Sequence, residues 1–206
     1  MVYINRAMEQ TFIRMSEQFK VVLLTGPRQV GKTTMLKKLA MEEDKKREYV
    51  SLDDINERNL AKNDPKLFLQ LHKPPVFIDE VQYAAELFPY IKIYVDEHQN
   101  PGDFWLTGSQ IFKLMEGVQE SLAGRVCLLH MSPLSQSEIY DFPSEPFTVD
   151  LESLLQRNRR SKGVSIEEVY KCIWQGGMPA LLNGTNTEHD AVSGSYISTY
   201  IDRDVR

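Results

Sequence analysis

The 206-residue sequence has little cysteine and little histidine: it contains two cysteines and four histidines. Cys127 and Cys172 form no Cys-x-x-Cys motif, so we expect reduced core thiols rather than a disulfide or a metal site. The histidines are scattered along the chain, and their spacing gives no support to a zinc site. We therefore expect neither disulfides nor zinc to hold this protein together.

The sequence also lacks a long apolar run, a signal peptide and an excess of basic residues. No apolar run approaches the length that spans a membrane, so no membrane partner is expected. Lys and Arg number 24 against 29 Asp and Glu, and the formal net charge of −5 gives no support to nucleic acid as a partner, although it does not exclude one. With 42% hydrophobic and 26% charged residues, we expect a soluble, cytoplasmic protein of one α/β domain and a small appendage.

A glycine-rich motif directly follows the apolar run 21–25. It reads Gly-x-x-x-x-Gly-Lys-Thr and predicts a phosphate-binding loop between a buried strand and a helix. The glycines let backbone N–H groups point at a phosphate, and the helix N-terminus adds partial positive charge. Lys32 supplies a charge for the outer phosphates, and Thr33 a hydroxyl ligand for Mg²⁺. The predicted nucleotide-binding residues are Gly26, Pro27, Arg28, Gln29, Val30, Gly31, Lys32, Thr33 and Thr34.

Apolar runs alternate with segments of helical periodicity along the first two thirds of the chain. This alternation predicts an α/β fold of the P-loop NTPase class, with a five-stranded parallel sheet flanked by helices. The expected strands are 21–25, 49–53, 75–80, 103–109 and 126–131. The expected helices are 6–18, 32–41, 87–98 and 110–122, with Met8, Phe12, Met15 and Phe19 as the core stripe of the first. Two short helices are also expected, one after Asp54, which fits a capping box with Glu57, and one after Asp64, where Pro65 would take the first helical position.

The pattern changes after Ser132-Pro133, where Ser135 and Glu138 form a capping-box pair. We place a domain boundary near 136–148, which gives a P-loop ATPase core over 1–135 and a small helical lid over 136–206. Helices are expected over 151–158, 165–174 and 187–206. The basic cluster 157–162 is interpreted as a solvated helix end, with a nucleic-acid patch as the alternative. Because the last helix stops at Arg206 without a cap, we expect an incomplete lid. The chain would then have been shortened either by experimental design or by an interruption of the gene.

Asp79 and Glu80 end the apolar run of the third strand, and ligands bind beyond such ends in parallel sheets. Phosphoryl transfer needs a carboxylate near Mg²⁺ and a group that orients or deprotonates the attacking water. We assign Asp79 to the Mg²⁺ shell and Glu80 to the catalytic water. A second carboxylate favours hydrolysis over phosphorylation of a small molecule, because a kinase must exclude water.

Two further positions have a functional and a structural interpretation each. Ser109 follows the fourth strand, where its hydroxyl could touch the γ-phosphate or the attacking water, with Thr107 and Gln110 as weaker candidates, or cap the next helix. Arg125 follows Gly124 just before the fifth strand. It is either an arginine finger for a neighbouring subunit's nucleotide or a cation that suits a helix C-terminus. A chain that lacks such a neighbour is expected to hydrolyse slowly.

Taken in order, six motifs resemble the AAA-like ATPases of bacteria and archaea that are usually described only as ATP-binding proteins. The motifs are Gly-Pro-Arg-Gln-x-Gly-Lys-Thr-Thr, Ser-Leu-Asp-Asp, Phe-Ile-Asp-Glu-Val-Gln, Leu-Thr-Gly-Ser, Ser-Leu-Ala-Gly-Arg and Gly-Gly-Met-Pro. The resemblance covers residues 1–206. It implies a P-loop ATPase that takes ATP and Mg²⁺. Its members often continue with a winged helix and a nuclease-like module, which this sequence does not contain, so nuclease activity has no support here.

The resemblance also implies roles for single residues. Lys32, Thr33, Asp79 and Glu80 take the roles already given, Ser109 lies near a sensor position, and Arg125 matches the finger position by analogy. Pro179, in Gly-Gly-Met-Pro, is similar to a turn by which lids of related ATPases touch adenine; a plain turn between helices is the alternative. Arg6 precedes the first helix, where relatives often contact base or phosphate.

These observations predict Mg²⁺-dependent ATP binding and hydrolysis by an AAA-like ATPase domain that couples nucleotide state to movement of the lid or a partner. A homo-oligomer with an arginine finger in trans is one such arrangement. Two alternatives stay open. The first is a nucleotide-binding switch with little turnover, and the second is the ATPase module of a DNA-associated protein.

Overall fold

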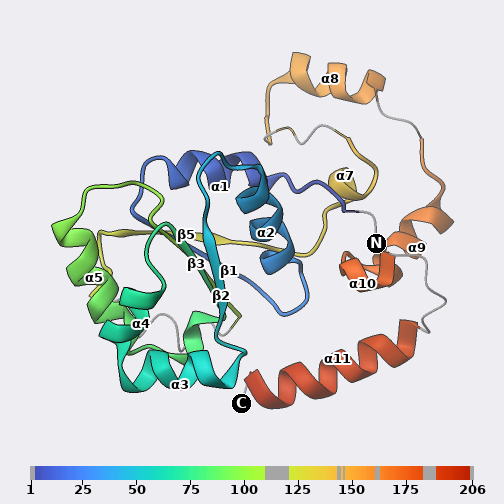
Figure 1. The fold of residues 1–206 in the computed structure, drawn as a ribbon. Helices are drawn as coiled ribbons and strands as arrows, with labels where there is room; N and C mark the ends of the chain where they lie inside the picture. Colours follow the sequence, from blue (N-terminus) through green and yellow to red (C-terminus); the bar gives the residue numbers. More distant parts are fainter. Residues whose placement is uncertain are drawn as a thin grey trace.

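The computed structural model describes residues 3–109, 121–142, 145, 147–160, 163–182 and 189–204, the last six of these by their backbone. Five strands form one parallel sheet in the order β2-β3-β4-β1-β5 (Figure 1). The strands are β1 Val21–Thr25, β2 Glu48–Ser51, β3 Val76–Asp79, β4 Phe104–Gly108 and β5 Val126–His130. The expected five-stranded parallel sheet is confirmed, and the predicted strand bounds differ from the observed ones by two residues at most.

Helices follow the strands as the alternation predicts. They are α1 Met8–Ser16, α2 Lys32–Glu42, α3 Ile55–Asn63, α4 Pro65–Leu71, α5 Leu87–Glu97, α7 Gln136–Ile139, α8 Leu151–Arg160, α9 Ile166–Gln175, α10 Pro179–Leu182 and α11 His189–Asp204, with a short 3-10 helix at Val81–Tyr83. The helix expected over 110–122 falls mainly on residues 110–120, which lie outside the described residues.

Alternating side chains of the strands build a core on each face of the sheet. Val22, Leu24 and Trp105 point to the face covered by α1 and α2, where Phe12 and Met35 are also fully buried (Figure 1). Their sequence neighbours on the same strands point to the opposite face, toward α3, α4 and α5. The stripe predicted on the first helix is therefore core packing, as expected, because Phe12 is buried and its companions pack against the same cluster.

Polar side chains fix the starts of three helices. Asp64 accepts a hydrogen bond from the Leu67 backbone and precedes a proline at the first helical position of α4, as predicted. Ser135 and Glu138 form the expected capping box at α7.

Asp54 caps α3, but the Glu57 carboxylate does not close the expected capping box there. It lies 2.9 Å from His72 Nε2, while the other ring nitrogen of His72 lies 2.7 Å from a Glu48 carboxylate oxygen.

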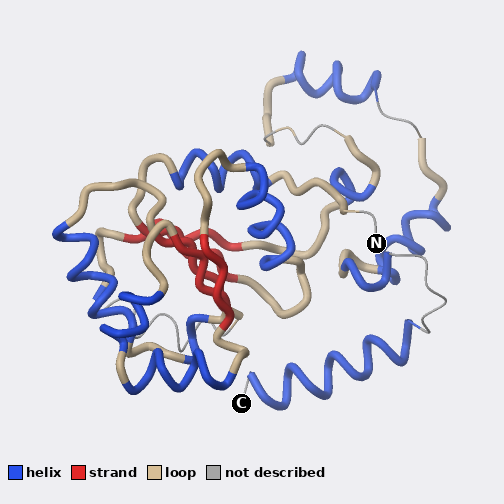
Figure 2. Tube along the Cα trace, in the orientation of Figure 1, coloured by secondary structure: helices blue, strands red, loops and turns tan. Residues whose placement is uncertain are grey.

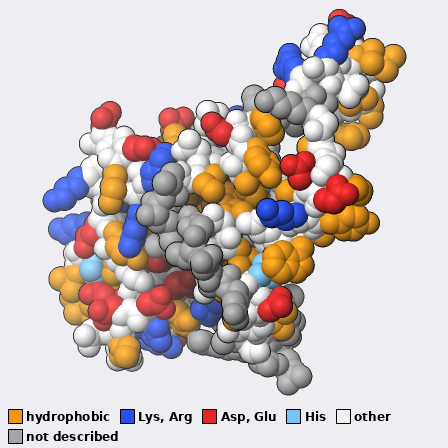
Figure 3. Space-filling model, turned by 90° about the vertical axis from the view of Figure 1, so that its right-hand side faces the viewer, with side chains coloured by type: hydrophobic (Ala, Val, Ile, Leu, Met, Phe, Trp, Pro, Cys, Tyr) orange, Lys and Arg blue, Asp and Glu red, His pale blue; other side chains and the backbone are white. Residues whose placement is uncertain are grey.

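The helices after residue 150 lie beside the α/β layers rather than on the sheet (Figure 2). Many of their large apolar side chains are exposed, and Figure 3 shows such side chains gathered on this part of the molecule. In the basic cluster, Arg157 and Arg160 both contact Glu145, at 2.7 and 3.4 Å. The domain boundary near 136–148 and the name lid stay predictions. None of the described helices is long and apolar enough to cross a membrane.

Candidate nucleotide-binding and catalytic site

The loop between β1 and α2 has the backbone that a phosphate cradle needs. Gly26 and Gly31 adopt φ values of 144° and 97°, which side chains disfavour, and Gln29 has a positive φ of 63°. A Cβ added to Gly26 would lie 2.2 Å from the Met131 carbonyl oxygen, so only glycine fits there. Gly31 is the N-cap of α2, and the first N–H groups of that helix therefore border the loop.

Lys32 is buried against the loop, with 4% of its surface exposed. Its Nζ donates hydrogen bonds to the carbonyl oxygens of Gly26, at 2.9 Å, and Pro27, at 2.8 Å. Burial lowers the pKa of the Lys32 ammonium, whereas the charges of Glu80 and Asp79 act in the opposite direction. A phosphate in the loop would add negative charge beside this desolvated cation and favour its protonated form.

Three hydroxyl groups converge on the buried carboxylate of Asp79 at the end of β3. Thr33 Oγ1 lies 2.9 and 3.1 Å from its two oxygens, Tyr49 donates from 3.1 Å, and Thr107 donates as well. Burial and the Asp79 charge raise the pKa of Tyr49 to about 12, so this phenol stays a donor at neutral pH. The motif spacing predicted that Thr33 and Asp79 meet. It gave no hint of Tyr49, which reaches the site from β2.

Glu80 lies next to Asp79 and has the left-handed backbone that is uncommon outside glycine, with φ 58° and ψ 45°. Its N–H donates to Thr107 Oγ1 over 3.2 Å, and its carboxylate Oε2 accepts hydrogen bonds from Ser109 Oγ, at 3.1 Å, and from Gln82 Nε2. The structure therefore brings Ser109 to Glu80. Sequence reasoning missed Gln82, although it lies two residues after Glu80 in the Phe-Ile-Asp-Glu-Val-Gln motif.

These groups suit a nucleotide with a hard divalent cation. Thr33 and Asp79 offer a hydroxyl and a carboxylate, which are the oxygen donors that Mg²⁺ prefers, and a backbone cradle lies next to them. Lys32 and Thr33 begin the helix after the loop, Asp79 ends β3 and Glu80 follows it, and β4 alone lies between β3 and β1 in the sheet. All four lie at the carboxyl edge of the parallel strands, where ligands of such sheets bind.

Arg6 has its guanidinium buried in a network that joins distant segments. Nε donates to Glu138 Oε1 over 3.0 Å, Nη1 to the Val30 carbonyl oxygen over 2.8 Å, and Nη2 to the Ser132 carbonyl oxygen over 2.7 Å. Sequence reasoning expected this arginine near a base or phosphate. Arg6 lies against the phosphate loop, where each of its three nitrogens donates to a protein acceptor, so Arg6 links the loop to the segment that leads into α7.

Arg125 lies at the opposite edge of the sheet, because it immediately precedes β5 while the loop follows β1 and the two strands are parallel. Its guanidinium makes a two-pronged contact with Asp96 of α5, at 2.6 and 3.0 Å. Both side chains are partly exposed, at 35% and 45%. This placement rules out a direct contact between Arg125 and a phosphate in its own loop.

The Gly176–Pro179 turn lies between α9 and α10, and it packs against the chain before α7. Leu134 N–H donates to the Gly177 carbonyl oxygen over 2.7 Å, and a Cβ on Gly177 would lie 2.1 Å from the Leu134 oxygen. Pro179 is the first residue of α10. Beside it, a cavity of about 200 Å³ opens between the phosphate loop and the C-terminal helices. It is lined by Gln29, Met178, Ala180, Leu181, Val192, Ser193, Tyr196 and Ile197.

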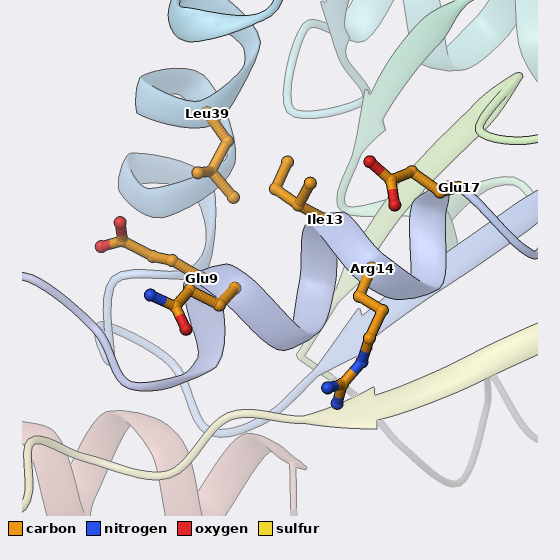
Figure 4. Close-up of a pocket in the computed structure, with 6 residues that line it drawn as sticks. Glu9, Ile13, Arg14, Glu17 and Leu39 are labelled. Carbon is orange, nitrogen blue, oxygen red and sulfur yellow. The ribbon is translucent and has the colours of Figure 1, made fainter.

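A second hollow, of about 380 Å³, lies between α1 and α2 (Figure 4). Glu9, Ile13 and Arg14 line it from α1, Glu17 from the residue that follows α1, and Leu39 points toward Ile13 from α2. No residue of the phosphate loop lines this hollow, so it is separate from the candidate site.

Comparisons with known proteins agree with this geometry. A family model described as an AAA domain matches residues 18–140. The uncharacterized proteins Rv2008c of Mycobacterium tuberculosis and Mb2031c of Mycobacterium bovis are each 30% identical over 187 residues. The match covers 90% of this chain and 36% of each relative, so the chain spans about a third of the length of the curated relatives it matches.

Solved structures share the fold at low sequence identity. The Walker-type ATPase PABY2304 of Pyrococcus abyssi aligns with a TM-score of 0.55 and 17% identity, over 96% of this chain and 72% of that one. AMPPCP-bound DnaA from Aquifex aeolicus aligns with a TM-score of 0.50 and 12% identity, over 97% and 62% of the two chains. These alignments support the α/β architecture of P-loop ATPases.

Proposed function

Since the chain belongs to the AAA domain family, we propose that it binds ATP with Mg²⁺ at the loop after β1 and hydrolyses it. The observation that carries this proposal is the meeting of four groups at the carboxyl edge of the sheet. Lys32 and Thr33 come from the loop and the first turn of α2, while Asp79 and Glu80 come from the end of β3. Phosphoryl transfer needs a cradle, a cation ligand and a water-positioning group, and these four residues match those needs.

Each residue has a distinct role in the proposed reaction. The loop amides and the Lys32 ammonium would hold the β- and γ-phosphates, and Thr33 and Asp79 would hold Mg²⁺, which would neutralise phosphate charge when bound. Glu80 orients a water whose oxygen forms a bond to the γ-phosphorus as the bond to the β–γ bridging oxygen breaks. A water proton passes to the Glu80 carboxylate, and the products are ADP and phosphate.

The cavity beside the loop is a candidate position for the base. Gln29 belongs to the loop, while Met178 and Ala180 flank Pro179 in the segment that the resemblance relates to adenine contact. We propose that the adenine enters this cavity and lies against the Pro179 turn. The cavity volume of about 200 Å³ suits a group of the size of a base better than a whole nucleotide.

Coupling between the nucleotide and the C-terminal helices follows from the Arg6 network. Its guanidinium bonds the loop at Val30 and the α7 segment at Ser132 and Glu138. A change in the loop on hydrolysis would therefore shift the hydrogen bonds that hold α7. We propose that this contact transmits nucleotide state to the helices after residue 135.

We also propose that Arg125 acts as a finger on a neighbouring subunit's nucleotide. Its place at the edge of the sheet opposite the loop suits action in trans. Such fingers contribute roughly 10³–10⁵ in rate, so the isolated chain is expected to turn over slowly.

Phosphate release at rising protein concentration tests the proposed hydrolysis, with wild type, Lys32→Ala and Glu80→Gln compared. We expect Lys32→Ala to lose nucleotide binding, and Glu80→Gln to keep binding and lose turnover. Equal phosphate release by wild type and Glu80→Gln at background level would refute the enzyme and leave a nucleotide-binding switch. Micromolar ATP affinity in Lys32→Ala would refute the phosphate site itself.

A further inference from the structure

We propose that Gln82 and Ser109 form a clamp that holds the Glu80 carboxylate in one position for its work on the attacking water. The inference rests on the proposed function and adds two positioning residues to it. Gln82 belongs to the 3-10 helix after β3, and Ser109 follows β4, so the clamp reaches Glu80 from two elements.

The contacts converge on a single oxygen. Ser109 Oγ donates to Glu80 Oε2 over 3.1 Å, and Gln82 Nε2 donates to the same oxygen. Gln82 Nε2 also lies 3.3 Å from Ser109 Oγ, which closes a triangle of three side chains. Because Oε2 accepts from both partners, we expect the carboxylate to keep one rotamer, with Oε1, which accepts no hydrogen bond from the described residues, as the oxygen that faces a water.

The burial of Gln82 and Ser109 argues against a role in packing alone, because apolar side chains would fill the same space without burying polar groups. Gln82 is 8% exposed and Ser109 4% exposed. The Gln82 Oε1 atom is buried and has no hydrogen-bond partner among the residues that the structure describes. An unpaired buried acceptor destabilises the fold, and an apolar side chain of similar size would avoid that loss. The functional end of this amide is therefore the Nε2 donor, which contacts Glu80.

The backbone of Glu80 supports the same interpretation. Its φ of 58° is unfavourable for a residue with a side chain, and such strain persists where surrounding contacts over-determine it. Thr107 Oγ1 accepts the Glu80 N–H and also donates to Asp79. Glu80 is thus held at the backbone by one neighbour and at the carboxylate by two. Ser109 acts through Glu80 in this arrangement rather than on the γ-phosphate.

The test compares Gln82→Ala, Ser109→Ala and the double variant with wild type, in steady-state phosphate release and in equilibrium binding of a fluorescent ATP analogue. Misplacement of a catalytic group by about 1 Å can cost 10²-fold, so we expect kcat to fall about 10- to 100-fold in each variant, with nucleotide Kd within about twofold of wild type. Gln82→Asn keeps the donor but shortens it, and should recover part of the loss. Gln70→Ala, on the exposed surface of α4, is the matched control.

Combination with Glu80→Gln separates positioning from folding. Because Glu80→Gln removes the carboxylate whose position the clamp is proposed to set, adding Gln82→Ala to Glu80→Gln should leave the residual rate unchanged. A further fall in rate, a wild-type kcat in both single variants, or an equal loss of Kd and kcat would overturn the clamp.

Crystal structures of wild type and the Gln82→Ala/Ser109→Ala double variant give a readout that is independent of turnover. We expect one Glu80 rotamer in wild type and several in the double variant. The same single rotamer in both would overturn the clamp even in a protein that does not hydrolyse ATP. Absence of turnover in wild type, together with the expected rotamer change, would instead refute the proposed function and leave the clamp standing.

Discussion

Glu138→Ala is predicted to cause a large loss of stability, because Glu138 is the hub of a buried polar network. Its Oε1 accepts hydrogen bonds from Arg6 Nε, at 3.0 Å, and from the Ala7 N–H, at 2.9 Å. Its Oε2 accepts from the Ser135 N–H, at 2.8 Å. The Arg6 and Glu138 side chains are 6% and 10% exposed, so solvent screens this ion pair little.

The magnitude follows from the charge that is left behind. Removal of one partner of a buried ion pair typically costs about 3–5 kcal/mol, since the remaining charge stays desolvated. For a chain of 150–250 residues, 1 kcal/mol shifts Tm by roughly 2–4 °C, so we expect Glu138→Ala to lower Tm by about 6–20 °C. Because Arg6 also holds the Val30 carbonyl of the phosphate loop, nucleotide affinity should fall in the same variant.

Urea unfolding followed by circular dichroism measures the effect, with Arg6→Ala and Arg6→Ala/Glu138→Ala completing a double-mutant cycle. We expect the double variant to lose less than the sum of the single ones, with a coupling of about 0.5–3 kcal/mol. Glu97→Ala, at an exposed position of α5, serves as control and should stay within about 0.5 kcal/mol of wild type. A loss below about 1 kcal/mol in Glu138→Ala, or full additivity in the cycle, would refute the network as a stabilising hub.

Three further predictions concern acid stability, the loop and the proposed finger. Burial would raise the pKa of Glu138 and of Glu9, but hydrogen bonds to the carboxylates, with those from the backbone largest, outweigh it and lower both below the usual 4.5. Stability should therefore be constant from pH 7 to about 5 and fall as pH drops through the lowered values, and unfolding midpoints that stay flat to pH 3 would contradict this sign. Gly26→Ala places a Cβ 2.2 Å from a backbone oxygen, so we expect loss of ATP-analogue binding in a titration, which wild-type affinity would disprove. Arg125→Ala should be inactive alone and regain turnover when mixed with Lys32→Ala, which supplies the finger; no recovery at any mixing ratio would exclude action in trans.

The sequence predicted best what short-range chemistry decides. The apolar run 21–25 matched β1 residue for residue, and the Asp64-Pro65 pair and the Ser135–Glu138 capping box were observed as expected. These features depend on residues within a few positions of each other, where capping and strand burial follow fixed geometry. The meeting of Thr33 with Asp79 was predictable for another reason, because parallel strands bring their carboxyl ends to one edge.

The contacts that sequence reasoning missed join residues far apart in the chain. Arg6 reaches Glu138 across 132 positions, and Tyr49 reaches Asp79 across 30. No periodicity records such a contact, because it depends on how strands and helices pack rather than on either segment alone. Glu57 illustrates the competition between local helix capping and contacts that depend on tertiary packing. Its position suits a capping box at α3, yet its carboxylate pairs with His72, which only the packing of α3 against α4 brings near.

The candidate site therefore has two layers with different origins. The groups proposed to touch phosphate and water occupy consecutive positions in the sequence, because a loop and a strand end must carry them in fixed order. The groups that hold those side chains come from wherever the fold supplies a donor, as Gln82, Ser109 and Thr107 do for Glu80 and Asp79. We expect the rate to depend on the second layer as well as on the first, since a carboxylate free to change rotamer positions water poorly. If the supporting donors prove dispensable while Glu80→Gln is inactive, the motif alone would be enough for catalysis, and the convergence of donors on Glu80 would reflect packing only.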